Sequence, residues 1–132
     1  MNRSIAELSI SIVIPAKNEA ENLITFLPRL VAAMPGVECI VVNDGSSDDT
    51  EVICERNGVI VVTHPYSKGN GAAIKTGAKK ASGDVIVFLD GDGQHKPEDI
   101  PKLLEKLTTG YDMVVGARDK LSQADSFRAI AN

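Results

Sequence analysis

The sequence lacks several features, and each absence excludes a class of protein. It has no apolar run near the roughly 18 residues that a membrane-spanning helix requires, and residues 1–8 are too polar for a signal peptide. The 14 basic residues are mixed along the chain with 18 acidic ones, so no basic stripe suggests a nucleic-acid partner. Gly-Lys never precedes Ser or Thr, which excludes a Walker phosphate loop.

Cysteine is also scarce. Cys39 and Cys54 fall in a predicted strand and a predicted helix, without metal-ligand spacing and without a CxxC pair. We therefore expect two buried free thiols in a protein of the reducing cytosol, and no disulfide.

What the chain does contain is a regular alternation of apolar patterns. Hydrophobic residues make up 43% of 132, which supports one packed domain. Short apolar runs predict strands at 10–14, 37–42, 59–63, 85–89 and 112–117. Helical spacing and helix-terminating residues predict helices at 23–34, 72–81 and 97–107, and a short helix between a capping box, Asp48 with Glu51, and Gly58. This rhythm indicates an α/β fold with a parallel sheet and helices on both faces.

Polar residues follow the predicted strands at the points where the strands end. In parallel sheets, ligands bind beyond the carboxyl ends of the strands, so we interpret this edge as a nucleotide-diphosphate site. Each residue also has a structural interpretation: Asp44 closes a turn with Gly45, and Lys68 is simply solvated. The strand-end residues are Asn18, Glu19, Asp44, Lys68, Asp90, Asp92, Gln94 and Arg118.

The predicted strand 85–89 leads without a spacer into two carboxylates. Asp90 and Asp92 are two residues apart, so extended backbone places both side chains on the same side. Oxygen ligands at a fixed edge suit a hard cation such as Mg2+ or Mn2+. A calcium EF-hand loop is excluded, because His95 and Pro101 stand where that loop requires Gly and Glu.

Two other interpretations of these loops compete with a nucleotide-diphosphate site. A phosphohydrolase with Asp90 as its nucleophile also places an acidic pair after an apolar strand. That class normally has this strand near the start of the domain and Ser or Thr after the glycine, whereas here Gln94 follows. A dinucleotide fingerprint at Gly69 fails, because Ile74 replaces its third glycine and the loop follows the third strand.

Taken together, the motifs resemble those of family 2 glycosyltransferases with the GT-A fold. They occur in the family's order and cover nearly the whole chain, at 11–19, 42–48, 68–72, 89–95 with 97–98, and 115–118. The Asp-Gly-Gln-His-x-Pro-Glu form and the Gly-Ala-Arg strand end are most similar to polyprenyl-phosphate (dolichyl-phosphate) glycosyltransferases. The resemblance implies a Rossmann-like, mainly parallel nucleotide-sugar-binding fold, of which this chain is the N-terminal, donor-binding part.

The resemblance also implies residue roles. Asp44 accepts a hydrogen bond from the base, and Gly91 allows close approach of the backbone. Asp90, Asp92 and Gln94 hold the metal on the diphosphate. Arg118 and Arg128 neutralise phosphate oxygens. The full nucleotide-sugar-binding set is Pro15, Lys17, Glu19, Val42, Asp44, Lys68, Asp90, Gly91, Asp92, Arg118 and Arg128.

The implied function is inverting transfer of a sugar from a UDP- or GDP-sugar to an acceptor, expected to be a polyprenyl phosphate. The metal acts as a Lewis acid on the leaving group. We expect residues 1–118 to form the donor-binding core and 119–132 to begin the acceptor-side half, with any catalytic base beyond Asn132. The chain alone should then bind donor and metal with little or no transfer.

Other expectations concern location, assembly and alternative functions. We expect a cytoplasmic protein, associated in its full-length form with the cytoplasmic face of a membrane. Apolar residues near the end, Phe127 and Ile130, suggest a surface for homo-oligomers. Two alternatives stay open at this point: a non-catalytic nucleotide-sugar-binding module, and the aspartate-nucleophile phosphohydrolase.

Overall fold

The computed structural model describes residues 9–89, 96–102, 104, 113–117 and 126–131. Within these residues a six-stranded sheet has the order β3-β2-β1-β4-β6-β5. The strands are β1 (Ile10–Ala16), β2 (Glu38–Asp44), β3 (Ile60–His64), β4 (Val85–Phe88), β5 (Met113–Ala117) and β6 (Ser126–Ala131). All five predicted strands are confirmed. The first four are joined in parallel, whereas β6 lies antiparallel between β4 and β5.

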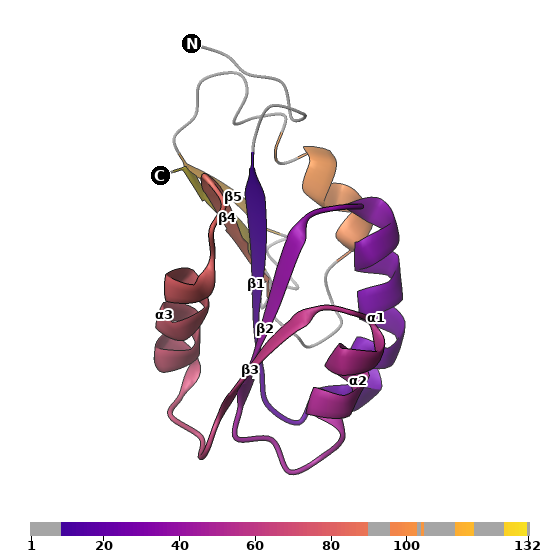
Figure 1. Ribbon diagram of the computed structural model, residues 1–132. Helices are drawn as coiled ribbons and strands as arrows, with labels where there is room; N and C mark the ends of the chain where they lie inside the picture. The colour runs from indigo at the N-terminus through magenta and orange to yellow at the C-terminus, as the bar shows by residue number, and fades with distance from the viewer. Residues whose placement is uncertain (1–8, 90–95, 103, 105–112, 118–125, 132) are drawn as a thin grey trace.

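Helices cover both faces of the sheet, as predicted (Figure 1). The described helices are α1 (Ala20–Ala33), α2 (Thr50–Arg56), α3 (Asn70–Lys80) and the 3-10 turn η2 (Pro97–Asp99), which continues as helix at 100–102 and 104. α1, α2 and η2 pack on one face, and α3 packs on the other against β1 and β2.

The core follows from the alternation of side chains along β1. Ile12 and Ile14 point into the larger apolar cluster beneath α1 and α2, and Val13 points into the smaller cluster beneath α3. α3 approaches this second face very closely: a Cβ added at Gly77 would lie 2.2 Å from Val13 Cγ1. The small buried residues of this helix, Ala73 and Gly77, therefore allow tight helix-to-sheet packing.

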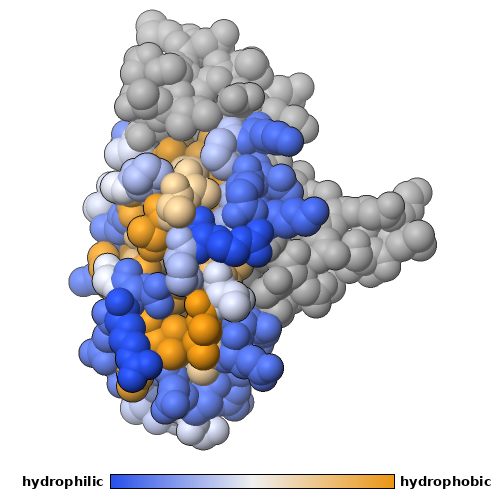
Figure 2. All heavy atoms as spheres, turned by 90° about the vertical axis from the view of Figure 1, so that its right-hand side faces the viewer, coloured by the Kyte–Doolittle hydropathy of each residue, from blue (hydrophilic) through white to orange (hydrophobic). Residues whose placement is uncertain are grey.

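The outer face of α1 and α2 is mostly hydrophilic, with apolar areas between charged side chains (Figure 2). Three exposed large apolar residues lie on these helices: Ile24, Val31 and Val52. No helix in the described part of the chain combines the length and the apolar composition that a membrane crossing requires.

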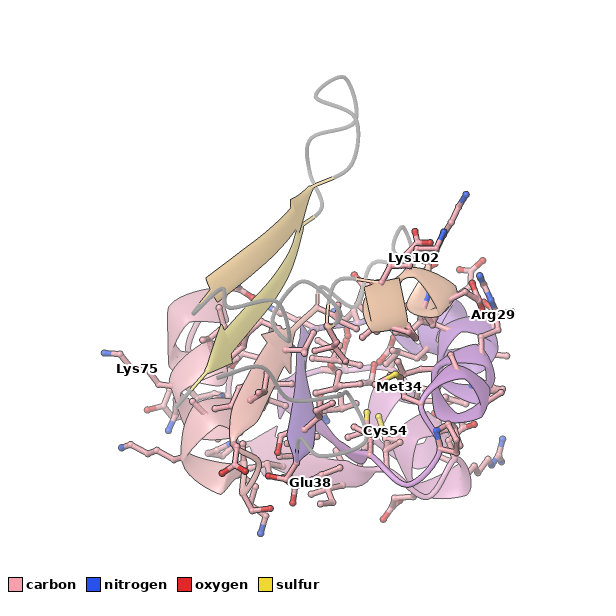
Figure 3. The ribbon with its side chains drawn as sticks, turned by 90° about the horizontal axis from the view of Figure 1, so that it is seen from above. Arg29, Met34, Glu38, Cys54, Lys75 and Lys102 are labelled. Atoms are coloured by element: carbon pink, nitrogen blue, oxygen red, sulfur yellow. The ribbon has the colours of Figure 1, made fainter. Side chains whose placement is uncertain are left out.

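Both cysteines are buried and free, as expected. Cys54 lies between the sheet and the helices, whereas Arg29 and Lys75 point outward (Figure 3). Burial raises the pKa of Cys39 to about 12 and that of Cys54 to about 11, so neither thiol ionises near neutral pH.

The predicted capping box is wrong. α2 begins at Thr50, one residue later than the motif requires, and its N-cap Asp49 makes no side-chain capping bond. Glu51 instead accepts a hydrogen bond from the Thr63 hydroxyl at 2.6 Å. A contact with the neighbouring strand has replaced the local one.

Candidate functional site

The loops that follow β1, β2 and β3 meet at one edge of the sheet, at the lower end of Figure 1. This arrangement follows from the parallel register, in which Pro15 and Ala16 pair with Val42 and Asn43. Each of these three loops leads into a helix, so the N-termini of α1, α2 and α3 also lie at this edge. Residues from three separate motifs of the sequence are thereby brought together.

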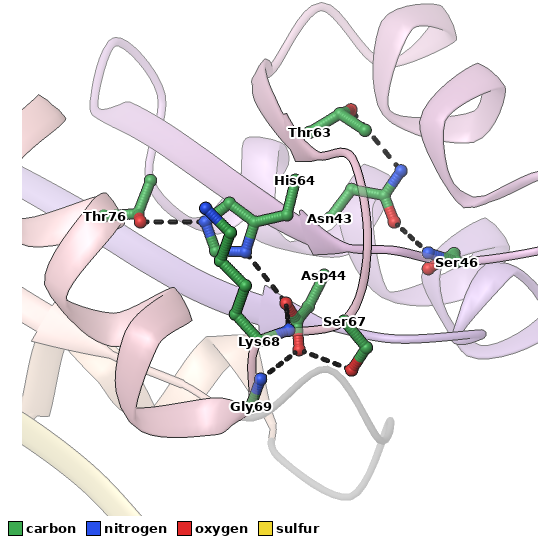
Figure 4. A network of polar contacts seen from close by, with 9 residues as sticks. All are labelled: Asn43, Asp44, Ser46, Thr63, His64, Ser67, Lys68, Gly69 and Thr76. Carbon is green, nitrogen blue, oxygen red and sulfur yellow. Dashed lines mark hydrogen bonds and ion pairs between the residues drawn. The ribbon is translucent and has the colours of Figure 1, made fainter.

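Asp44, at the end of β2, is the centre of a polar network (Figure 4). Its side chain is buried, and its Oδ1 accepts from the Lys68 N–H at 2.8 Å and lies 2.8 Å from His64 Nδ1. Its Oδ2 accepts from the Gly69 N–H at 3.0 Å and from the Ser67 hydroxyl at 3.1 Å. A carboxylate has about four acceptor positions, and these donors use them all. Asp44 therefore fixes the loop that precedes α3.

The same donors determine the charge of Asp44. Burial by itself would raise the pKa of this carboxyl, but the hydrogen bonds from Lys68, His64, Gly69 and Ser67 outweigh it and lower the pKa from 3.8 to about 2. Asp44 is thus ionised at any pH near neutrality.

The loops after β1 and β2 hold each other through side chains. Asn18, with φ of +54°, accepts from the Ser47 N–H at 2.8 Å, and its own N–H donates to the Ser46 hydroxyl at 2.9 Å. Asp48 accepts from the Ala20 N–H, at the start of α1, and from the Thr50 N–H, at the start of α2. One carboxylate therefore caps two helices, and the edge of the sheet is held as a unit.

A cavity of about 250 Å³ opens at this edge. Its residues come from the end of β1, the end of β2 and the first turn of α3 with its preceding loop. They are Pro15, Ala16, Lys17, Asp44, Ser67, Gly69, Asn70 and Ala73. The cavity has apolar walls, one lysine, and the N-terminus of α3, whose partial positive charge favours anions. A larger hollow lies at the opposite edge, near Glu38 and Met34, away from these strand ends.

Three of the predicted site residues line the cavity: Pro15, Lys17 and Asp44. Glu19 instead accepts from the Asn22 side-chain amide at 2.6 Å. Val42 is fully buried beneath α3.

Lys68 donates its backbone N–H to Asp44, and its ammonium group lies 5.3 Å from the centre of the Tyr66 ring. Its side chain is therefore engaged by an aromatic face, and it is not among the residues that line the cavity.

The predicted metal ligands Asp90, Asp92 and Gln94, together with Gly91 and Arg118, lie outside the described residues. Arg128 lies in β6, opposite Phe88 of β4 and Val115 of β5. In the described part of the chain, no three residues of the types His, Cys, Asp and Glu cluster as a metal site would require.

Sequence reasoning placed the loop at Lys68 at this edge but assigned no role to His64, Ser67, Asn70 or Thr76. The only available signal was the register: Asp44 pairs with His64 because β2 and β3 are parallel and end together. A single sequence predicts the two strands but not their alignment. The contact between the Asp44 side chain and His64 was therefore not predicted.

The sequence model of glycosyl transferase family 2 matches residues 11–131. The chain is 39% identical over 117 residues to a dolichol-phosphate mannosyltransferase of Pyrococcus furiosus, covering 84% of this chain and 33% of the relative. It is 38% identical over 129 residues to an undecaprenyl-phosphate 4-deoxy-4-formamido-L-arabinose transferase of Pseudomonas fluorescens. This match covers 90% of this chain and 38% of the relative.

Two solved structures have the same fold. The glucosyl-3-phosphoglycerate synthase of Mycobacterium tuberculosis, in complex with Mn2+, UDP and glucosyl-3-phosphoglycerate, superposes with a TM-score of 0.71 at 32% identity, covering 85% of this chain and 44% of that one. The mannosyltransferase of Pyrobaculum calidifontis, in complex with GDP-Man and Mn2+, superposes with a TM-score of 0.82 at 17% identity. The match covers 99% of this chain and 46% of that one, and at this identity it shows the fold alone.

The chain belongs to glycosyl transferase family 2 and has the GT-A fold. Among its relatives are transferases named for polyprenyl phosphates, as the motifs predicted. The chain spans between a third and a half of the length of these four proteins.

Proposed function

We propose that this chain is the donor-binding part of an inverting glycosyltransferase that transfers a sugar from a UDP- or GDP-sugar to a polyprenyl phosphate. The observation that carries the proposal is the cavity formed by the ends of β1 and β2 and the first turn of α3. Such an edge is where open α/β sheets bind their ligands. Family membership and the names of the relatives support transfer over the phosphohydrolase alternative.

Each part of the cavity suits a part of the donor. Pro15, Ala16 and Ala73 offer apolar surface to the nucleoside. Lys17 and the N-terminal turn of α3 offer positive charge to the diphosphate. Asp44 acts mainly by holding the loop of Ser67 and Gly69 in place, because its acceptor positions are already occupied.

A divalent cation is part of the proposal. Asp90, Asp92 and Gln94 would hold it, and their two carboxylates and one amide are hard oxygen donors that suit Mg2+ or Mn2+. β4 runs parallel beside β1, with the Leu89 N–H donating to the Val13 carbonyl at 3.0 Å, so the chain leaves β4 toward the cavity edge. When bound, the cation offsets the charge of the departing diphosphate.

The acceptor chemistry requires little from this chain. A phosphate oxygen is already a nucleophile, so direct displacement at the anomeric carbon needs no strong base and inverts the configuration. Arg118 and Arg128 would neutralise phosphate oxygens. The groups that present the acceptor are proposed to lie outside this sequence, so the chain alone should bind the donor without efficient transfer.

The test is a thermal-shift panel of UDP-, GDP- and TDP-sugars, each with and without Mn2+. A ligand at about 100 times its Kd should stabilise the protein by roughly 2.7 kcal/mol. We expect a shift with one base, larger with Mn2+, and none with the matching nucleoside. Asn70→Asp provides a matched variant, because it places an acid at the start of α3, where it favours the helix and repels the diphosphate.

Asn70→Asp should therefore raise the melting temperature without ligand and reduce the ligand-induced shift. Absence of a shift with every nucleotide in the folded wild-type chain would refute the donor site. Rapid transfer to a polyprenyl phosphate by these 132 residues alone would refute the division between donor and acceptor parts.

A further inference from the structure

His64 is a buried, titratable residue at the end of β3 that the proposed chemistry does not use. Only 6% of it is exposed. Its Nδ1 lies 2.8 Å from Asp44 Oδ1, and its Nε2 lies 2.8 Å from the Thr76 hydroxyl (Figure 4). The ring therefore connects the ends of two strands with the middle of α3.

The directions of these hydrogen bonds follow from Asp44. An ionised carboxylate can only accept, so His64 Nδ1 must carry the proton of that bond. The hydroxyl of Thr76 can donate to an unprotonated Nε2 or accept from a protonated one. Both ring nitrogens are thus satisfied, and the ring orientation is fixed by partners on two different elements.

Asp44 connects the ring of His64 to the wall of the cavity through its hydrogen bonds. The oxygen that contacts His64 also accepts from the Lys68 N–H, and the other oxygen binds Ser67 and Gly69. Asp44, Ser67 and Gly69 are three of the eight residues that line the cavity. A rotation of the Asp44 carboxylate would displace part of the cavity wall.

We propose that His64 is a positioning residue for the donor nucleotide: through its Nδ1 bond to Asp44, it sets the loop that forms one wall of the cavity. This inference rests on the proposed function, because it assigns the cavity to a nucleotide. The bond to Asp44 carries this role, and the bond to Thr76 steadies the ring.

Two substitutions separate the two bonds. In His64→Asn, the side-chain amide stands near the position of Nδ1 and can still donate to Asp44, but it does not reach Thr76. In His64→Gln, the amide stands near the position of Nε2 and keeps Thr76, but it withdraws from Asp44. Thr76→Val is the control that removes the second bond without touching the ring.

Affinity for UDP and GDP in the presence of Mn2+ is measured at a temperature at which circular dichroism shows every variant folded. We expect His64→Gln to weaken binding by about tenfold or more, because it breaks a hydrogen bond to a charged group. His64→Asn and Thr76→Val should stay close to wild type. Equal affinities of the Asn and Gln variants would overturn the proposal.

Amide hydrogen exchange without ligand tests the same link independently of nucleotide binding. The N–H groups of Lys68 and Gly69 should lose protection in His64→Gln and keep it in His64→Asn, because only the latter retains the donor that fixes Asp44. If the wild-type chain binds no nucleotide, the proposed function fails. The difference in exchange between the two variants still tests whether His64 holds the loop through Asp44. Equal protection in the two variants would overturn it.

Discussion

Arg29 and Glu98, 69 residues apart in the chain, form an ion pair through two hydrogen bonds. Arg29 Nε donates to Oε2 at 3.2 Å, and Nη2 donates to Oε1 at 2.5 Å. The pair joins α1 to η2, the turn that follows the acidic stretch at 90–95. Glu98 belongs to one of the family motifs, and its described contact is with α1. The contact attaches the chain to α1 just beyond the proposed metal ligands.

The first prediction follows from this anchor. Both side chains are about half exposed, at 49% and 54%, so Arg29→Met should hardly change the melting temperature. It should weaken Mn2+-dependent nucleotide binding several-fold, because Glu98 loses its link to α1 just beyond the acidic stretch. Lys102→Met removes an exposed charge from the helix that follows η2 and serves as the control. Equal binding by the two variants would contradict the anchor.

The sequence predicted the elements better than their mutual alignment. Strands and helices have local signals, such as the apolar run before Asp90 and the helical spacing from Leu23, and polar strand ends follow directly from them. The bonds of Asp44 and Glu51 depend instead on which residues of different elements stand side by side: Asp44 of β2 beside His64 of β3, and Glu51 of α2 beside Thr63 of β3. β6 was not predicted, because its antiparallel place between β4 and β5 depends on pairing across the sheet.

A second prediction concerns the proposed metal ligands. Asp92→Ala should abolish the Mn2+-dependent part of nucleotide binding and leave stability nearly unchanged or improved, since neighbouring carboxylates repel without a cation. Asp84→Ala removes an exposed acid before β4 and should bind like wild type. Isothermal titration with and without Mn2+ measures the difference. Unfolding of Asp92→Ala would mean that the acidic pair is structural.

A third prediction compares two glycines with similar backbone. Gly45 has φ of +70°, and a Cβ added there would lie 2.5 Å from the Ser67 nitrogen. Gly36 has φ of +78° with no atom within 4 Å of an added Cβ. Gly36→Ala should therefore cost only the backbone strain, about 1 kcal/mol. Gly45→Ala should cost clearly more and also weaken nucleotide binding, because the loop before α3 must move. Equal losses in chemical denaturation would contradict this close packing.

A fourth prediction concerns acid. The pKa of Asp44 is lowered from 3.8 to about 2 in the folded protein. Its contribution to stability is therefore fully present above pH 4 and is lost as the pH falls through 2, which amounts to about 2 kcal/mol. Denaturation of wild type and Asp44→Asn between pH 6 and 2 isolates this contribution. The stability difference between the two proteins should shrink by that amount toward pH 2, and a difference independent of pH would contradict the assignment.

The last prediction separates two adjacent aspartates. Asp49 stands at the N-cap position of α2 but makes no capping bond, whereas Asp48 accepts from the Ala20 N–H at 3.1 Å and from the Thr50 N–H at 3.0 Å. Asp48→Ala should cost about 2 kcal/mol, because two helix starts each lose a cap. Asp49→Ala removes the same charge and should be nearly neutral. Because α1 and α2 share this carboxylate, Asp48→Ala should also reduce amide protection at the start of α1, 28 residues away in sequence. Loss of protection at α2 alone would show that the two loops are capped separately.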